Sequence, residues 1–159
     1  MNQEFYNEME KLLSPEAILI NEPMSKHTTF RIGGNADMFV SPEITQVPAI
    51  MKLAKEYQVP VTIVGNGSNL LVGDKGIRGL VLAFGKAAET VTVDGNHITA
   101  GAGALLSKIA AEAVKNSLAG FEFAAGIPGT IGGALVMNAG AYDGEMKDVL
   151  VSAKVLTKE

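Results

Sequence analysis

The chain has 159 residues, of which 47% are hydrophobic and 19% are charged. This composition is too apolar for a disordered chain, and the length suits one domain or a part of a larger protein. The net charge of −4 and the lack of a basic run argue against nucleic acid or an anionic membrane as the main partner. With no cysteine and only two histidines, far apart, the sequence also argues against a disulfide, a metal site or a cysteine nucleophile.

The hydropathy pattern predicts a cytoplasmic protein. The first residues, Met1 to Phe5, include an acid and do not begin the apolar core of a secretory signal. No stretch approaches the about 18 uninterrupted apolar residues that a membrane span needs. The lack of cysteine is compatible with a reducing compartment.

Hydrophobic periodicity predicts helices and strands along the whole chain. In chain order we expect a helix over 2–13, an extended and loop-rich segment over 17–29, a strand over 36–40, a helix over 43–58, a buried strand over 59–64, a strand over 79–84, a hairpin over 89–100, a helix over 105–116, a short helix over 134–137 and a strand over 149–156. This order is typical of a mixed α/β or α+β domain. Because the chain stops three residues after the last expected strand, we also expect it to be a fragment.

The strand expected at 59–64 runs into a loop of small polar residues. Its members are Gly65, Asn66, Gly67, Ser68 and Asn69. Glycine permits positive φ and a close approach of the main chain to a ligand, and successive N–H groups in such a turn can converge on an anion. The loop is not a Walker loop, and Leu70 breaks the dinucleotide fingerprint. A diphosphate-binding loop and a tight turn between strands remain about equally supported.

A second loop, over 124–134, contains four glycines, one proline and no charged residue. An exposed turn normally carries Asp, Asn or similar polar residues. A neutral loop rich in glycine suits close packing against a flat, uncharged ring system, whereas the alternative is a buried turn of small residues before a helix. Two such loops in one short chain favour the ligand interpretation.

A few further polar residues are weaker candidates. Asn138 could bind a ligand or cap the end of a helix, and capping is favoured. Arg31 and Arg78 are the only arginines, and either could pair with a phosphate, although a surface ion pair is the better interpretation for Arg78. We expect His27 and His97 to be exposed loop and strand residues rather than catalytic groups.

Four segments together resemble a known family. Residues 28–34, 65–71, 126–134 and 138–142 are strongly similar to UDP-N-acetylenolpyruvoylglucosamine reductases, also called UDP-N-acetylmuramate dehydrogenases, and order and spacing agree over about residues 20–157. The resemblance implies an α+β FAD-binding fold of the vanillyl-alcohol oxidase (PCMH) type with two α+β subdomains, the second incomplete.

The resemblance also implies a division of the chain. Residues 1–20 would form an N-terminal helix and lead-in segment, residues 21–84 the first FAD-binding subdomain, and residues 85–159 the start of the second. The C-terminal substrate domain would be absent from this chain. The family's catalytic Arg, Ser and Glu would then lie beyond Glu159, so we expect no catalytic residue and no activity from this chain alone, and weak or no retention of FAD.

By resemblance, the full-length protein would use NADPH to reduce FAD, and reduced flavin would convert a UDP-sugar enolpyruvate to UDP-N-acetylmuramate for peptidoglycan. The family's FAD-contacting positions correspond here to Gly65, Asn66, Gly67, Ser68, Asn69, Gly126, Ile127, Pro128, Gly129, Thr130, Gly132, Gly133, Ala134 and Asn138. The first loop would bind the pyrophosphate, and the second would line the flavin and the rest of FAD.

The sequence also indicates how FAD would be attached and which other classes of protein it disfavours. Because the chain has no cysteine and no histidine beside either loop, we expect noncovalent FAD and no metal. Another flavoprotein of this fold, such as the FAD-binding subunit of a molybdenum hydroxylase, would share only the first loop. A non-catalytic nucleotide-binding module would have no use for the neutral second loop. We expect replacement of Gly67 by a β-branched residue to weaken FAD binding more than it lowers stability.

Overall fold

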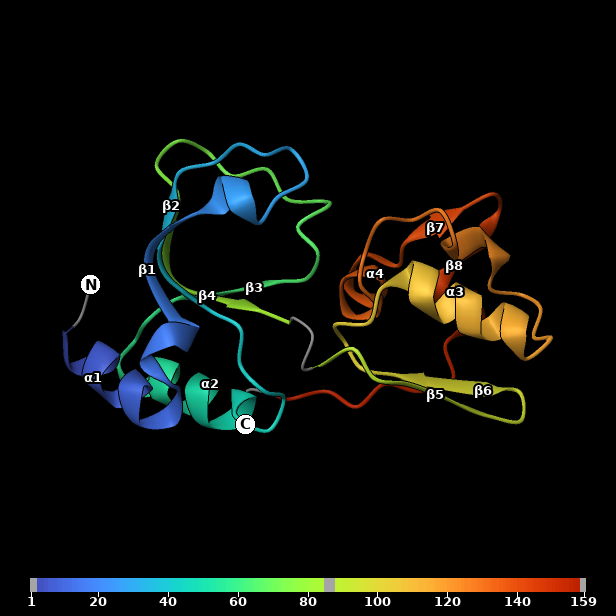
Figure 1. Cartoon of the computed structure of the whole chain (residues 1–159), viewed down its shortest axis with the longest axis horizontal. Helices are drawn as coiled ribbons and strands as arrows, with labels where there is room; N and C mark the ends of the chain where they lie inside the picture. The colour runs from blue at the N-terminus through green and yellow to red at the C-terminus, as the bar shows by residue number, and fades with distance from the viewer. Residues whose placement is uncertain (1–2, 85–87, 158–159) are drawn as a thin grey trace. The chain divides into compact units, whose positions relative to one another are not determined.

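The computed structural model describes residues 3–84 and 88–157, and the chain divides into two compact units (Figure 1). The first unit spans Met1–Ala88 and the second spans Glu89–Glu159. The boundary expected between residues 84 and 85 adjoins residues 85–87, which lie outside the described residues. The two units are described separately below.

The first unit is built on a four-stranded sheet with the order β1-β2-β4-β3. Its strands are β1 (Ile18–Pro23), β2 (Asn35–Val40), β3 (Val61–Val64) and β4 (Ile77–Ala83), and its helices are α1 (Gln3–Leu12), η1 (Pro15–Ala17), η2 (Met24–Lys26) and α2 (Val47–Glu56). Strand β1 is antiparallel to β2, whereas β2 and β3 are both parallel to β4. The carboxyl ends of β3 and β4 therefore meet at the same edge of the sheet.

Helices α1 and α2 cover one face of this sheet. Side chains alternate between the faces of a strand, so Met38, Val40, Leu80 and Leu82 all point towards the helices. They pack against apolar residues of α1 and α2, among them Phe5, Met9, Val47, Ile50 and Ala54. Full burial of one large apolar side chain stabilises a fold by about 1.5–3 kcal/mol, so this cluster is the main core of the unit.

Two long loops cover the other face. Phe39 and Val81 point away from the helices and pack with Met24 and Val72, which belong to the loops 24–34 and 65–76. Figure 1 shows these loops side by side, at the end of the unit away from α1 and α2. The loops that the sequence marks by their glycines thus complete the core of the first unit.

The two loops touch through their main chains. The Thr29 N–H donates to the Gly67 carbonyl at 3.2 Å, and the Gly34 N–H donates to the Gly73 carbonyl at 3.0 Å. Gly67 has a φ of +64°, and a Cβ placed on it would lie 1.9 Å from the carbonyl oxygen of His27. Gly67 is therefore required both for its left-handed backbone and for this close approach.

The second unit combines two small β-hairpins with short helices. Its elements are β5 (Val91–Asp94), β6 (His97–Ala100), α3 (Leu106–Lys115), η4 (Glu122–Ala124), α4 (Ile131–Met137), β7 (Gly140–Ala141), β8 (Gly144–Glu145) and α5 (Met146–Val149). β5 pairs with β6 and β7 pairs with β8, both antiparallel. One cluster of its buried core contains Leu106, Phe123, Ala124, Ala134 and Met146.

Most of the expected elements are confirmed, with shifted ends. The helices expected at 2–13, 43–58 and 105–116 are α1, α2 and α3, and the hairpin expected at 89–100 is β5–β6. The short helix expected at 134–137 begins earlier, at Ile131. Val114 of α3 is 77% exposed although it is apolar.

Two expectations about strands are wrong, and a third is incomplete. The segment expected to be extended and loop-rich at 17–29 is so, but its extended part is the strand β1, whose partner β2 lies further along the chain and cannot be inferred from local composition. The run at 59–64 forms β3 at the edge of the sheet, where Ile63 is 57% exposed, because a β-branched run indicates a strand but not its place in a sheet. The segment 149–156 forms no strand: α5 ends at Val149, and no described strand pairs with the exposed residues that follow.

Two negative findings concern the described residues alone. Within 3–84 and 88–157, no helix has the length and apolar character to cross a membrane. In the same ranges, no cluster of three or more His, Asp or Glu side chains could hold a metal ion.

The loop contact yields a stability prediction. We expect Gly67→Ala to lower the free energy of unfolding by about 2 kcal/mol or more, because left-handed strain and the collision with the His27 carbonyl both act on the folded state. Gly73→Ala is the matched control in the same loop, since a Cβ there meets nothing within 4 Å. Urea denaturation followed by circular dichroism measures both variants. Equal midpoints for Gly67→Ala and Gly73→Ala would contradict the close contact.

The end of β1 yields a prediction about pH. Partial burial acts to raise the pKa of the Glu22 carboxyl, but hydrogen bonds from His27 and Lys26 outweigh it and hold this pKa below its ordinary value. A carboxyl with a lowered pKa stabilises the fold above its unfolded pKa, and this stabilisation is lost as the pH falls through the folded pKa. We therefore expect the unaltered chain to lose more unfolding free energy than Glu22→Gln between about pH 6 and about pH 3.5. Urea melts across this range test it, and parallel losses in the two proteins would refute it.

Candidate functional site

The first glycine-rich loop begins where β3 ends. Val64 is the last residue of β3, and its carbonyl accepts a hydrogen bond from the Phe84 N–H at the end of β4. In open sheets with parallel strands, ligands commonly bind beyond the carboxyl ends of the strands. Of the loop residues, Asn66 and Asn69 are exposed, Ser68 is half-buried and Gly67 is buried. The loop thus presents polar side chains at its surface while its central glycine packs inside.

The fold itself requires glycine at position 67, whether or not a ligand binds there. The space beside its Cα is occupied by the main chain of His27 and Thr28. A larger residue at this position therefore strains the unit before any cofactor is considered. The expectation that its replacement weakens FAD binding more than stability stays a prediction, but such a variant cannot isolate contact with a ligand.

The segment 28–34 runs alongside this loop and exposes a short apolar and cationic tip. Phe30 is 59% exposed and Ile32 is 54% exposed, and Arg31 between them has a φ of +54°. The hydroxyl of the buried Thr28 donates to the Ile32 carbonyl at 3.1 Å and closes the turn. Arg31 is exposed, so a phosphate contact by its side chain stays a prediction.

The other arginine has structural partners, as expected. Arg78 forms an ion pair with Asp37, and it donates to the carbonyl oxygens of Asn35 and Lys75, both at 2.9 Å. The surface ion pair predicted for Arg78 is confirmed.

The two histidines differ from each other. His97 is exposed on β6, as expected. His27 was expected to be an exposed loop residue, and this is wrong: its side chain is 25% exposed and stacks on Phe39 at 4.0 Å between ring centroids. The short-range sequence pattern gave no sign of this contact, because Phe39 lies on the next strand.

The second glycine-rich loop leads from η4 into α4. Thr130 is buried, and its hydroxyl oxygen accepts from the Gly133 N–H at 3.4 Å, which makes it the N-cap of α4. The N–H groups of Ile131 and Gly132 donate to the carbonyls of Ala104 and Ala102, at 2.8 and 2.9 Å. The first amides of α4 are therefore occupied within the unit, so the start of this helix does not offer them to an anion.

The glycines of the second loop fall into two groups. A Cβ on Gly126 would meet nothing within 4 Å, and a Cβ on Gly133 would meet only the Thr130 hydroxyl at 3.5 Å. A Cβ on Gly132 would lie 2.9 Å from the Ala102 carbonyl, so this glycine serves the packing of α4. The Gly129 carbonyl accepts from the Leu106 N–H at 3.0 Å. Gly126 and Gly133 thus leave bare main chain at the surface.

Of the remaining predicted residues of this loop, two belong to or contact the core and one is exposed. Ala134 is buried in the core of the second unit, and Ile127 packs against that core. Pro128 is exposed. Contacts of these three residues with FAD stay predictions.

Asn138 ends α4 in the left-handed conformation, with φ 46° and ψ 49°. Its Nδ2 donates to Glu145 at 2.5 Å, and its Oδ1 accepts from the Lys147 N–H at 3.0 Å. Hydrogen bonding, first from Lys147 and also from Asn138, lowers the pKa of the Glu145 carboxyl although partial burial opposes the shift. The favoured capping role is what the structure shows, and a contact of Asn138 with a ligand stays a prediction.

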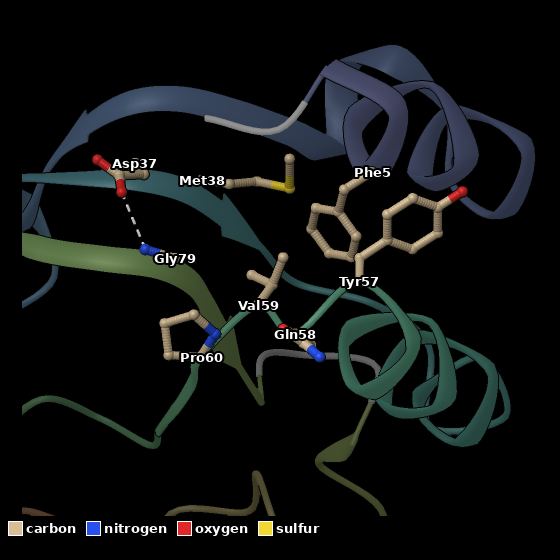
Figure 2. Close-up of a pocket in the computed structure, with 8 residues that line it drawn as sticks. All are labelled: Phe5, Asp37, Met38, Tyr57, Gln58, Val59, Pro60 and Gly79. Atoms are coloured by element: carbon tan, nitrogen blue, oxygen red, sulfur yellow. Dashed lines mark hydrogen bonds between the residues drawn. The ribbon is translucent and has the colours of Figure 1, made fainter.

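Two pockets lie away from these loops. One in the first unit, of about 240 Å³, lies between α1, the end of α2 and the sheet. Figure 2 shows the rings of Phe5 and Tyr57 on one side of this pocket and Pro60 on the other. The Gly79 N–H donates a hydrogen bond to the Asp37 carboxylate at 2.9 Å. The second, of about 390 Å³, is an open hollow in the second unit beside Phe123 and Tyr142. No predicted site residue lines either of these two pockets.

Comparison with known proteins identifies the family of these loops. A family model described as an FAD binding domain matches residues 36–159. The UDP-N-acetylenolpyruvoylglucosamine reductase of Agathobacter rectalis is 52% identical over 171 residues, which cover all of this chain and 54% of that protein. The protein of the same name from Desulforamulus reducens is 54% identical over 143 residues, covering 89% of this chain and 47% of that protein. The chain spans about half the length of the curated relatives it matches.

Solved structures support the fold. The UDP-N-acetylenolpyruvylglucosamine reductase of Thermus caldophilus has a TM-score of 0.64 and 34% identity, over 82% of this chain and 45% of that one. An alkyldihydroxyacetonephosphate synthase has a TM-score of 0.70 over 95% of this chain and 32% of that one, and at 19% identity it shows the fold alone. p-Cresol methylhydroxylase has a TM-score of 0.51 and 17% identity, over 74% of this chain and 26% of that one, and likewise shows the fold.

These findings confirm two expectations from the sequence. The α+β fold of the PCMH type is confirmed by the solved structures, and the resemblance of the loops to UDP-N-acetylenolpyruvoylglucosamine reductases is confirmed by the curated relatives. Since the matching family model extends over most of the residues, from Ala36 onward, the chain belongs to the FAD-binding domain family.

Proposed function

We propose that the chain is the FAD-holding part of an NADPH-dependent UDP-N-acetylenolpyruvoylglucosamine reductase. The observation that carries the proposal is identity above 50% to curated reductases across nearly the whole chain, both glycine-rich loops included. In the full-length protein, FAD supplies hydride transfer from NADPH to the enolpyruvyl double bond of the UDP-sugar, in the synthesis of peptidoglycan. A UDP-sugar substrate and a cytoplasmic location belong to the same proposal.

The first loop holds the diphosphate of FAD in this proposal. Its position beyond the carboxyl end of β3 supports the role, as do the exposed amides of Asn66 and Asn69 and the hydroxyl of Ser68. Such donors bind phosphate oxygens without a lysine, through a turn in which Gly67 takes a left-handed conformation. The main-chain contact of Gly67 with His27 holds the turn in place before the ligand arrives.

The second loop meets the uncharged part of FAD in this proposal. Residues 124–137 carry no charge, and Gly126 and Gly133 leave open space above the main chain. A flat ring can approach such a surface within van der Waals distance, whereas the occupied first amides of α4 offer little to a phosphate. Gly129, Thr130, Gly132 and Ala134 shape this surface from within.

The chemical step is not assigned to side chains of this chain. The residues of this chain bind and orient the cofactor in this proposal. An FAD-binding subunit of another enzyme, such as a molybdenum hydroxylase, is disfavoured because the curated relatives that match both loops are named as reductases.

The cofactor and the reaction can be tested with the full-length protein. We expect it to purify yellow, to release its flavin on denaturation because the attachment is noncovalent, and to oxidise NADPH only when the UDP-sugar enolpyruvate is present. The 159-residue chain alone is expected to show no such turnover. Visible absorption before and after denaturation, together with NADPH consumption, measures these outcomes. A colourless full-length protein that takes up no added FAD would overturn the proposal.

The second loop can be tested through its open glycines. We expect Gly126→Leu and Gly133→Leu each to weaken FAD binding about tenfold or more, because a side chain there occupies space required by the ring. Neither change should lower the urea midpoint, since a Cβ at these positions meets no close atom. Ala111→Leu, on an exposed position of α3, is the matched control. If both glycine variants bind FAD as tightly as the control, the ring does not lie on this loop.

A further inference from the structure

The ring of His27 joins a loop to two strands of the first unit. It stacks on Phe39 of β2, with 4.0 Å between centroids and 25° between planes, and Phe39 is 5% exposed. Its Nε2–H donates to the Glu22 carboxylate of β1 at 3.0 Å. The side chain of Glu22 is 13% exposed, and Lys26 lies 3.3 Å from the same carboxylate oxygen. The ring is thus held by an aromatic surface below it and a charged acceptor beside it.

The main chain of the same residue supports the first glycine-rich loop. The His27 carbonyl lies 1.9 Å from where a Gly67 Cβ would be, and the Thr28 Cα lies 3.1 Å from that point. The Thr29 N–H donates to the Gly67 carbonyl at 3.2 Å. Residues 27–29 therefore form the surface on which the centre of the loop 65–69 rests.

We propose that His27 is a positioning residue for the loop 65–69, because its ring fixes the main chain on which Gly67 lies. This inference rests on the proposed function, in which that loop binds the diphosphate of FAD. The sequence of contacts runs from Phe39 and Glu22 to the His27 ring, and from the His27 main chain to Gly67. Donor atoms that bind a diphosphate must stay within a fraction of an ångström of their places, so a displaced support lowers affinity.

Hydrogen bonds within the loop 24–34 do not replace this support. The His27 N–H donates to the Met24 carbonyl at 2.8 Å, and the Thr28 hydroxyl donates to the Ile32 carbonyl at 3.1 Å. Both bonds join residues of the same loop, so they set its shape rather than its place above the sheet. The buried Met24 anchors the start of this loop on Phe39 and Val81, and the ring contacts of His27 with two strands anchor it at the residue whose carbonyl lies against Gly67.

The test compares four forms of the full-length protein: unaltered, His27→Ala, His27→Phe and Ile50→Val. His27→Phe keeps a ring on Phe39 and loses the bond to Glu22. Ile50→Val is the control, because Ile50 is buried among the residues that α2 packs on the opposite face of the sheet. The measurements are hydrogen exchange of the amides of residues 66–69, affinity for FAD and for ADP, and the urea midpoint of each form.

We expect His27→Ala to speed exchange of these amides and to weaken FAD and ADP about tenfold, because both ligands carry the diphosphate. His27→Phe should recover most of the loss, and Ile50→Val should change neither exchange nor affinity even where its urea midpoint falls. If His27→Ala does not fold, Glu22→Gln takes its place, with a smaller change in the same direction. A merely structural role predicts instead that affinity follows the urea midpoint in all variants.

Unchanged exchange of residues 66–69 in His27→Ala overturns the inference, whatever the ligand does. Faster exchange with unchanged affinity for FAD and ADP also overturns it and leaves the proposed function standing. If the unaltered protein binds neither ligand, the proposed function fails, and the exchange data alone then decide whether His27 positions the loop.

Discussion

The first unit depends on a contact between two stretches of main chain. The loops 24–34 and 65–76 close the face of the sheet that the helices leave open, and they can do so only if their backbones lie against each other. Gly67 beside His27 and Gly34 beside Asp74 supply this closeness, since a Cβ at either glycine would lie within about 2 Å of a carbonyl oxygen. The same main-chain contacts therefore complete the core of the unit and set the shape of its candidate binding loop.

This double use explains why glycine alone does not reveal function. Gly67 and Gly132 are required by neighbouring main chain of their own units, whereas Gly126 and Gly133 face open space. All four look alike in the sequence. The distinction between a glycine that serves packing and one that leaves room for a ligand comes from the backbone that surrounds it, and that backbone arrives from distant residues.

Local patterns nevertheless carried much of the fold. The periodicity at 105–116 and the local pattern at 89–100 identified α3 and the hairpin β5–β6, because both depend on residues close in the chain. The loops at 65–69 and 126–134 were located by composition, and their residue sequences together indicated the family. What escaped prediction depends on partners far along the chain: β1 needs β2, β3 lies at an edge, and the alternating residues after Val149 pair with no described strand. The ring of His27 finds Phe39 for the same reason.

The two loops also differ in the polarity of the groups that they expose. The first presents amide and hydroxyl groups around a turn, and the second presents neutral main chain and apolar side chains beside a helix whose first amides are occupied. In the proposed function, the first loop binds the charged linker of the cofactor and the second binds its uncharged ring. This division supports the proposed function, which the identity to curated reductases carries.

The strand order of the first unit has a consequence for folding kinetics. β4 is the last strand of the sheet in the chain, yet it lies between β2 and β3. During synthesis, β2 and β3 must wait for β4 to emerge before either gains its parallel neighbour, and the closing step joins segments about forty residues apart. Until that insertion, the main-chain N–H and C=O groups on the side of β2 that β4 will occupy have no sheet partner. The nascent unit therefore passes through a stage in which it is vulnerable to misassociation, and insertion of the central strand ends that stage.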